Sequence, residues 1–473
     1  MTILHQFPHA FWSDGAAPAI IHAAQIWSYT ELRNRLNVRT TLLRSQGVQP
    51  GQVVLAPDSP GLDLLLMQHA LARLGAALLP YRMGLAESEL SLLSGMTGAE
   101  WQWRTDLETV LATGCSTAKS TGSAASIALL IQTSGSRGIP KVAMLTADNL
   151  LASALAVNAR LNLHPGDLWL TCLRLSHVGG ISIGYRCALA GATLLLHDRF
   201  DARSVIADLY QRPVTHLSLV PPMLARILDL DSTPPPRLRV LLVGGQATSR
   251  LLIQRTLNAG WPLYLTYGMT ETATQIATTE CLIGKVPEPG LVGRLLPGLE
   301  IEVPNCESIP SALRIRGAMV MAGYANPNRE PGHGLDNGWF ESADLACLTK
   351  AGELKVLGRA DRIRVIGGNN VSLDQVESVL TAAEGVTDAV VVALDDSIWG
   401  CRLIAVYCGE IAETALAHWC HARLCGSQRP RAFLRLAQIP LLDSGKYDRL
   451  QIESVARSAF VNGLETVPGQ QLT

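Results

Sequence analysis

The amino-acid sequence predicts an α/β multidomain protein whose mainly parallel sheets are covered by helices on both faces. The first observation is an alternation, from about residue 15 to residue 265, of short apolar runs with segments of helical periodicity. Continuous apolar runs between helices are typical of parallel strands buried on both faces. The second observation is length, because 473 residues exceed what one hydrophobic core usually holds. The clearest runs are Val53–Ala56, Ala76–Leu79, Ala128–Ile131, Leu168–Thr171, Thr193–Leu196 and Val240–Val243.

The pattern changes after about residue 290, where short strands are separated by Gly, Pro and Asn turns. This texture predicts a small antiparallel, barrel-like subdomain. Its strands are expected at Glu300–Val303, Leu313–Arg316 and Leu354–Leu357.

A compact α+β pattern begins after Arg359. We therefore place a domain boundary near residue 361, with an N-terminal domain over residues 1–360 and a C-terminal domain over residues 361–473. Helices are expected in the second domain at Leu373–Ala383 and Glu413–Leu424, and strands at Ala389–Ala393 and Leu403–Tyr407.

Composition limits the class of protein. Hydrophobic residues make up 48% of the chain, charged residues 17%, and the formal net charge is −1. This profile is typical of a globular enzyme and lacks the basic excess of a nucleic-acid binder. The start of the chain has no basic stretch followed by an apolar one, so we expect no secretory signal and a cytoplasmic location. The apolar segment Leu62–Pro80 is interrupted by polar residues, which predicts a buried helix leading into a strand instead of a membrane span.

The ten cysteines are scattered and lack C-x-x-C pairs, so they do not suggest a disulfide scaffold. One cluster, comprising His418, Cys420, His421 and Cys425, offers atoms that could bind a metal. On a helix, however, neighbouring residues point in different directions. We therefore interpret these cysteines as small apolar side chains.

The strongest local motif directly follows the apolar strand that ends at Gln132. Its small residues let the backbone curl around phosphate oxygens, its hydroxyls add donors, and its lysine adds positive charge. The spacing differs from that of a Walker A loop, and the alternative interpretation is a flexible connection. The motif reads Thr133, Ser134, Gly135, Ser136, Arg137, Gly138, Ile139, Pro140 and Lys141.

A second motif, Tyr264–Glu271, combines aromatic rings, hydroxyls and a carboxylate at the end of an expected strand. An aromatic face can stack on a planar ring. A carboxylate can hold Mg²⁺ together with substrate phosphates. The alternative interpretation is a strand-to-helix turn with Thr270 as the N-cap.

Two further motifs lie near the C-terminal domain. Gly358–Arg362, followed by Ile366–Asn370, is interpreted either as part of a site or as a polar linker. In Pro440–Arg449 the Gly445–Lys446 pair lies in an expected loop. A lysine there is usually a surface residue, but it can also reach into a distant active site and stabilise charge.

Taken together and in this order, the four motifs resemble those of the adenylate-forming superfamily, which comprises acyl-CoA synthetases, nonribosomal adenylation domains and luciferases. The resemblance runs from the segment Trp27–Leu32 to Arg449 and so covers nearly the whole chain. It implies two αβ subdomains and a small β-barrel-like subdomain, followed by a small mobile C-terminal lid. It also implies ATP and Mg²⁺ as cofactors and CoA as co-substrate.

The resemblance assigns roles to individual residues. Residues 133–141 would bind the phosphates, and Asp344 and Arg359 would bind the ribose. Glu271 would hold the magnesium ion and Thr270 would contact the α-phosphate. The segments along the rest of the nucleotide would be Gly244, Gly245 and Gln246, and Tyr267, Gly268 and Met269, with Tyr267 stacked near the adenine.

The resemblance also implies a two-step reaction. Lys446 would close over the acyl phosphate while the acid attacks ATP and displaces pyrophosphate. Rotation about Asp361 would then present the face with Gly367 and Gly368 to the thiol. One position departs from the pattern, because the family usually has Ser or Thr where this chain has Arg137.

The segment from Leu173 to Ile183 bears on the acid. It places His177, Gly179 and Gly180 at the position where the superfamily gates the acyl pocket, with Arg186 nine residues after the histidine. This run looks like that of the o-succinylbenzoate–CoA ligases of menaquinone and phylloquinone synthesis. A dicarboxylate needs one carboxylate activated and the other anchored, and Arg186 is the candidate anchor. The alternative interpretation is a surface or structural arginine on a helix expected at Ile183–Ala190.

Other interpretations remain open. The chain could be a different aryl- or acyl-CoA ligase, because pocket residues diverge quickly within one fold. It could be a stand-alone adenylation enzyme that loads a carrier protein, or a catalytically silent binding protein of the same fold. In each case the expected partners are small molecules, with neither nucleic acid nor membrane, and homo-oligomerisation is left open.

Overall fold

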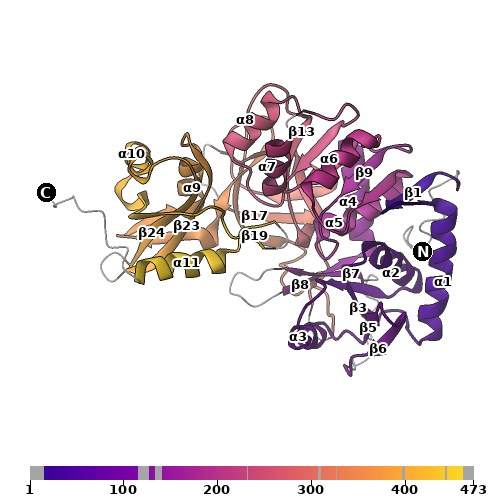
Figure 1. Cartoon of the computed structure of the whole chain (residues 1–473). Coiled ribbons are helices and arrows are strands. Elements are labelled where there is room, and N and C mark those ends of the chain that lie inside the picture. Colours follow the sequence, from indigo (N-terminus) through magenta and orange to yellow (C-terminus); the bar gives the residue numbers. More distant parts are fainter. Residues whose placement is uncertain are drawn as a thin grey trace.

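Two large sheets form the N-terminal part of the chain, and a smaller α+β unit lies at the other end of the molecule (Figure 1). The computed structural model describes residues 15–115, 127–133, 141–231, 233–306, 311–325, 328–396, 400–442 and 445–461. The mixed α/β architecture predicted from the sequence is confirmed, with the strands of both sheets close to the expected apolar runs.

The first sheet runs in the order β16-β17-β19-β20-β15-β14-β13-β12-β11-β9-β10-β1-β2. From β13 to β1 every neighbouring pair of strands is parallel. This parallel part is connected through helices, as parallel strands require. Its strands are β1 (Pro18–His22), β9 (Leu168–Thr171), β10 (Thr193–Leu196), β11 (His216–Leu219), β12 (Val240–Val243) and β13 (Leu263–Met269), and the edge strand β2 (Gln25–Ser28) pairs antiparallel with β1.

The antiparallel strands predicted for the small subdomain are present, and they continue this same sheet without closing into a barrel. Strand β13 pairs with β12 on one side and with β14 on the other. Both edges of β13 are therefore occupied. The end strand β16 cannot pair with β13, which a closed barrel of these strands would require. The strands are β14 (Thr274–Thr278), β15 (Leu291–Leu295), β16 (Leu299–Glu302), β17 (Ser311–Gly317), β19 (Phe340–Leu348) and β20 (Glu353–Arg359).

The second sheet has the order β18-β8-β7-β4-β3-β5-β6. Its central strands β7, β4, β3 and β5 are parallel, and antiparallel hairpins extend it at both ends. The strands are β3 (Val53–Pro57), β4 (Ala77–Tyr81), β5 (Trp101–Arg104), β6 (Thr109–Ala112), β7 (Ile127–Thr133), β8 (Lys141–Thr146) and β18 (Gly323–Tyr324).

A shared helical layer separates the two sheets. One apolar core joins residues of α1, α2, α4 and α5 to strands of both sheets, while α6, α7 and α8 cover the outer face of the first sheet and α3 covers the second. In the described parts of the chain no helix is long and apolar enough to cross a membrane. The helices are α1 (Tyr29–Ser45), α2 (Gly61–Leu74), α3 (Glu87–Thr97), α4 (Ala147–Leu161), α5 (Val178–Ala190), α6 (Ala202–Gln211), α7 (Pro221–Leu230) and α8 (Arg250–Asn258).

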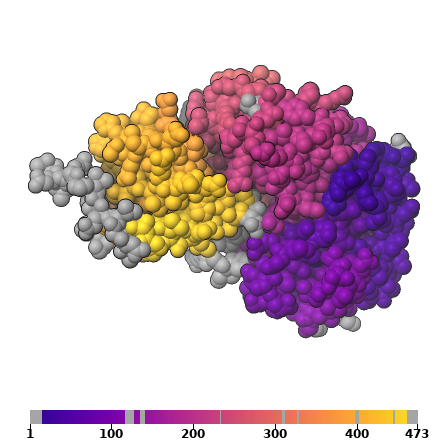
Figure 2. Space-filling view, in the orientation of Figure 1, coloured from indigo at the N-terminus to yellow at the C-terminus, as the bar shows by residue number. Residues whose placement is uncertain are grey.

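The C-terminal unit forms a lobe beside the N-terminal part (Figure 2). A sheet in the order β23-β24-β25 has α9 and α10 on one face and α11 on the other. The elements are β21 (Ile363–Ile366), β22 (Asn369–Ser372), α9 (Leu373–Thr381), β23 (Val386–Asp396), β24 (Gly400–Gly409), α10 (Glu413–Arg423), β25 (Ala432–Arg435) and α11 (Arg449–Val461).

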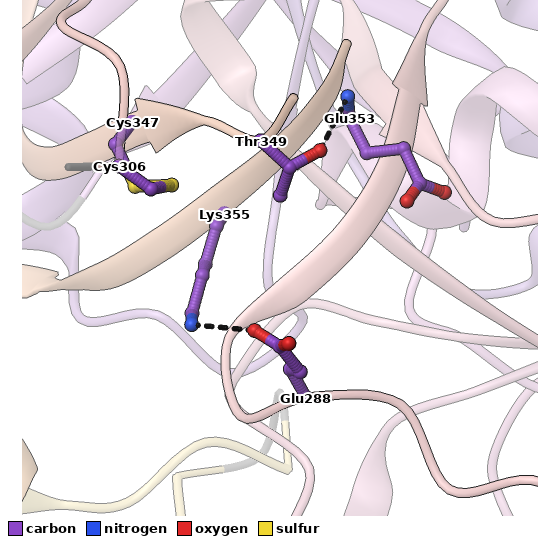
Figure 3. The surroundings of a disulfide bond; sticks show 6 residues. All are labelled: Glu288, Cys306, Cys347, Thr349, Glu353 and Lys355. Carbon is purple, nitrogen blue, oxygen red and sulfur yellow. Dashed lines mark hydrogen bonds and ion pairs between the residues drawn. A yellow bond between two sulfur atoms is a disulfide. The ribbon is translucent and has the colours of Figure 1, made fainter. Parts of the chain in front are cut away.

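A disulfide joins Cys306, just after β16, to Cys347 in β19 (Figure 3). The same segment is held by backbone hydrogen bonds, because Cys306 N donates to Leu348 O at 3.0 Å and Leu348 N donates to Pro304 O at 3.0 Å. The scattered cysteines did not predict this bond, since its partners are 41 residues apart and meet only through the sheet.

Replacement of Leu36 by Ala tests the shared helical layer. Leu36 of α1 is fully buried in the common core. Its truncation leaves a cavity, and we expect a loss of about 2–5 kcal/mol in the free energy of unfolding. Val38→Ala on the same helix is the matched control, because Val38 is 70% exposed and should change stability by less than about 0.5 kcal/mol. Urea denaturation followed by tryptophan fluorescence measures both, and equal losses would contradict the layer's role.

Candidate active site

The phosphate-loop motif bridges the hairpin of β7 and β8. Thr133 ends β7 and Lys141 begins β8, and the two residues are paired across the strands. The remaining predicted loop residues lie outside the described residues; they are Ser134, Gly135, Ser136, Arg137 and Gly138. The structure therefore gives the position of the two loop ends, and the roles of the residues between them stay predictions.

Glu271 lies in a short 3-10 turn (Thr270–Thr272) at the end of β13. Its carboxylate accepts a hydrogen bond from the Tyr324 hydroxyl, with Oη and Oε1 2.7 Å apart. The ring of Tyr324 also faces Lys141, whose Nζ lies 4.6 Å from the ring centroid. Tyr324 thus connects the end of the phosphate loop to the predicted magnesium ligand. Sequence reasoning missed it, because Tyr324 stands 53 residues from Glu271 and belongs to no motif.

Asp344 of β19 and Arg359 of β20 face each other across paired strands. Asp344 Oδ1 accepts from Arg359 Nη1 at 3.2 Å, and Oδ2 accepts from the Tyr267 hydroxyl. Burial and the neighbouring carboxylate hold the pKa of Tyr267 well above its usual value. The arrangement brings together three residues that the resemblance assigns to the nucleotide. Tyr267 remains a predicted adenine neighbour, and its hydroxyl is engaged by the predicted ribose ligand.

Lys446 approaches this group from the C-terminal unit. Its side chain is open to solvent, yet surrounding protein atoms are numerous enough for desolvation to lower the pKa of the ammonium group. The Glu271 carboxylate opposes this shift, and Arg359 adds to it. The preceding Gly445 lies against the Val220 side chain at the start of α7. The lobe therefore reaches the site through this loop.

The segment Gly244–Gln246, which follows β12, lies beside β13. Gln246 has a buried Nε2 without a hydrogen-bond partner among the described residues. A buried amide donor without a partner is costly, and a nucleotide acceptor would satisfy it. Gly244 packs against Thr266 of β13, and Gly245 adopts a left-handed conformation with φ of 85°. At Gly268 a side chain would collide with Thr274 O, so the bulge before Met269 requires glycine.

His177 is the N-cap residue of α5 and is exposed. Its amide donates to Arg174 O at 3.2 Å, and its carbonyl accepts from Gly180 N at 3.1 Å. A Cβ at Gly180 would lie 2.3 Å from Arg174 O, so only glycine permits this close approach. Gly179 has open space around it. The predicted acyl-site residues therefore form one compact turn at the start of the helix.

Arg186 lies deeper, two turns along α5, and only 2% of it is exposed. Its Nη2 donates to Thr274 Oγ1 at 2.7 Å, and its Cζ lies 5.5 Å from the Trp169 ring centroid. The Nε has no partner among the described residues. Burial lowers the pKa of the guanidinium to about 10. Its burial excludes a surface role, and among the described residues no carboxylate pairs with this cation, so an anionic ligand would stabilise it.

Asp361 lies in the 3-10 turn (Ala360–Arg362) between the two units. Arg359 binds it in a bidentate manner, with Nε and Nη2 at 2.9 and 2.8 Å from the carboxylate oxygens. The amide of Arg359 also donates to Asp374 Oδ2 of α9 at 2.9 Å. Gly367 and Gly368 form an exposed two-residue turn between β21 and β22, both with positive φ. The hinge and CoA-side roles stay predictions.

Comparison with known families matches residues 93–325 to the AMP-binding enzyme family and residues 375–446 to the C-terminal domain of AMP-binding enzymes. Together these matches span more than half of the chain. The chain belongs to the AMP-binding enzyme family. This membership confirms the resemblance on which the assignment of the nucleotide site depends.

Two curated relatives of this chain share the same name. The chain is 32% identical over 337 residues to a 2-succinylbenzoate–CoA ligase of Bacillus cereus, which covers 69% of each protein. It is 28% identical over 462 residues to the enzyme of the same name from Bacillus pumilus, covering 92% of this chain and 94% of the relative.

Solved structures agree on the fold. An ATP-bound enzyme called MatB, from Rhodopseudomonas palustris, superposes with a TM-score of 0.85 at 22% identity, covering 97% of this chain and 99% of the other. The o-succinylbenzoate coenzyme A synthetase of Bacillus subtilis, in complex with ATP and magnesium, gives a TM-score of 0.80 at 25% identity, with 93% and 97% coverage.

Tyr324→Phe tests the link between Glu271 and the phosphate loop. Loss of a hydrogen bond to a carboxylate costs about 1.5–3 kcal/mol, so we expect the Mg²⁺ concentration for half-maximal acyl-adenylate formation to rise roughly 10-fold. ATP–pyrophosphate exchange at varied Mg²⁺ measures it. Tyr210→Phe is the control, because Tyr210 is half-exposed on α6 and donates to Thr233 O at 3.1 Å. An unchanged Mg²⁺ dependence in Tyr324→Phe would rule out this role.

Proposed function

We propose that the protein is an AMP-forming acid–CoA ligase that activates o-succinylbenzoate and transfers it to CoA. The observation that carries the proposal is that Lys446 of the C-terminal unit lies within electrostatic range of Glu271, Asp344 and Arg359, while the adjacent Gly445 lies against Val220 of the N-terminal part. The names of the curated relatives support the acid. The pathway implied by the resemblance is menaquinone synthesis.

In the first half-reaction a carboxylate oxygen of the acid attacks the α-phosphorus of ATP. The new bond gives the acyl-adenylate, and the broken bond releases pyrophosphate, which carries the electron pair away. Lys446 is placed to stabilise the charge that develops on the transferring group. By the resemblance, Thr270 would contact the α-phosphate and His177 would gate the acyl pocket.

The described residues fit ATP and magnesium. Glu271 offers a carboxylate of the kind that Mg²⁺ uses together with phosphate oxygens, and Tyr324 orients it. Gln246 offers an unpartnered buried donor to the base, and Asp344 offers a carboxylate to the ribose. When bound, the metal ion would neutralise phosphate charge.

In the second half-reaction the thiol of CoA attacks the acyl carbon and displaces AMP, and the thiol proton leaves to solvent. We propose that the C-terminal lobe rotates about Asp361 between the two steps, which removes Lys446 and brings the Gly367–Gly368 turn to the thiol. The contacts of Arg359 with Asp361 and Asp374 span this hinge. Breaking them would be part of the rotation.

Arg186 is proposed to anchor the second carboxylate of the acid. It is buried, it lies on the helix that His177 starts, and its Nε is unpartnered among the described residues. A desolvated carboxylate–guanidinium pair is strong because it combines charge with directed hydrogen bonds. Thr274 holds the other end of the guanidinium in place.

AMP release with ATP, Mg²⁺ and CoA across a panel of acids tests the acid. We expect selective turnover of o-succinylbenzoate over benzoate, 4-hydroxybenzoate, coumarate and medium-chain fatty acids, with the thioester identified by mass. Arg186→Lys should raise the KM for o-succinylbenzoate about 10-fold or more, since it loses the bidentate geometry. Arg160→Lys is the control, because Arg160 of α4 pairs with the exposed Glu280.

The outcomes separate the alternatives. Turnover of another acid would keep the ligase and discard the quinone assignment. Pyrophosphate exchange without a CoA thioester would favour an enzyme that loads a carrier protein. Absence of both activities with every acid would favour a silent binding protein of this fold.

Lys446→Ala should lower acyl-adenylate formation at least about 100-fold, because one charge stabiliser of the transition state is lost. Since burial lowers the pKa of Lys446, the ammonium group loses its proton at a lower pH than an ordinary lysine. Exchange activity should therefore fall as the pH rises through that lowered pKa. Lys446→Arg should lose this alkaline decline, because a guanidinium stays charged. An identical decline in the Arg variant would assign it to another group.

A further inference from the structure

A buried carboxylate outside the nucleotide site joins the two large sheets. Asp58 follows β3 of the second sheet and is 5% exposed. Its Oδ2 accepts from the Ser176 hydroxyl at 2.7 Å, and its Oδ1 accepts from the amide of Met83 at 3.0 Å. Ser176 belongs to the loop after β9 of the first sheet. Asp58 therefore connects segments 118 residues apart.

The loop that Asp58 holds is the one that ends in His177. Ser176 directly precedes this histidine, and the amide of His177 donates to Arg174 O at 3.2 Å. The first turn of α5 contacts the same two residues. The amide of Gly180 donates to His177 O, and the Cα of Gly180 packs closely against Arg174 O. Residues 174–180 thus form one unit, and a displacement of Ser176 would displace His177.

The charge of Asp58 makes the attachment strong. Arg174 Nη1 lies 3.6 Å from Asp58 Oδ2, with side-chain exposures of 33% and 2% respectively. If the loop moved away, the carboxylate would lose the Ser176 hydroxyl and the Arg174 guanidinium together. The amide of Met83 would then remain as a partner of the carboxylate, and a buried carboxylate that loses a hydroxyl and a cation is destabilised, so the loop resists this movement.

The base of the attachment is itself rigid. Three residues after Asp58, the amide of Gly61 at the start of α2 donates to Asp198 Oδ1 at 2.8 Å. Asp198 Oδ2 also bonds His22 Nε2 at 2.9 Å. The amide of Asp58 donates to Tyr81 O at 2.8 Å. The segment that carries Asp58 is therefore held by both sheets independently of its contact with Ser176.

We propose that Asp58 is a positioning residue for the acyl site: through Ser176 and Arg174 it holds the turn with His177 in the place where the acid is recognised. Asp58 itself contacts no substrate. The inference rests on the proposed function, since it takes His177 as an acyl-site residue. It adds that selectivity for the acid depends on a carboxylate of the second sheet.

Steady-state kinetics of Asp58→Ala and Ser176→Ala test the proposal. Each variant should raise the KM for the acid about 10-fold, the factor that corresponds to about 1.4 kcal/mol, and should change the KM for ATP less than about 2-fold. Asp58→Asn should recover only part of the loss, because its single amide oxygen can still accept from Ser176 but the charge that faces Arg174 is gone. Because the proposed effect of Ser176 runs through Asp58, the double variant should be no worse than Asp58→Ala alone.

Asp63→Ala is the matched control. Asp63 is a neighbouring carboxylate on α2 that binds Arg39 Nη2 at 2.6 Å and Trp103 Nε1 at 2.7 Å, and none of its described contacts reaches residues 174–180. It should lower stability while leaving both KM values unchanged. Additive effects of Asp58→Ala and Ser176→Ala, or equal changes in the two KM values, would overturn the proposal.

A second readout separates this proposal from the proposed function. Hydrogen exchange of the amides of residues 174–180 should become at least about 10-fold faster in Asp58→Ala and Ser176→Ala but not in Asp63→Ala. This measurement needs no substrate. Unchanged exchange would overturn the role of Asp58 even if o-succinylbenzoate is turned over. If the wild type prefers another acid, the proposed substrate is wrong. The same set of single and double variants, assayed with the preferred acid, then still tests the role of Asp58.

Discussion

The rest of the structure depends on the apolar layer of α1, α2, α4 and α5 that the two sheets share. Each sheet buries one face on these helices, so neither can shift without opening the common core. This constraint brings the carboxyl ends of β13 and the β7–β8 hairpin to one region. Tyr324, on the short edge strand β18, can then contact Glu271 and Lys141 together. The nucleotide site is a consequence of how the sheets pack.

Charge organises the site that this packing creates. Acidic and basic groups alternate from Glu271 and Lys446 through Asp344 and Arg359 to Asp361. Asp344 is the most buried of these residues, and its carboxylate accepts from both Arg359 and Tyr267. Arg359 contacts the predicted ribose ligand on one side and the predicted hinge residue on the other.

The acyl side follows a different physical rule. His177 caps the start of α5 and is exposed, whereas Arg186 lies two turns further along the same helix and is buried. The turn at its start is held by Asp58 through Ser176, across the boundary between the sheets. The antiparallel strands after β13 extend the first sheet without closing into a barrel, because both edges of β13 are occupied. Thr274 on the first of them supports Arg186.

The sequence by itself determined the strands, the order of the motifs and the family, because apolar periodicity and short motifs are local properties. Lys446, Glu271, Asp344 and Arg359 were all named from motifs, and the structure brings them together. Only the tertiary structure decided which residues support them. Tyr324 pairs with Glu271 over 53 residues and Asp58 with Ser176 over 118, and the Cys306–Cys347 disulfide spans 41. Such partners are set by how sheets and helices pack, and a local pattern carries no record of that packing.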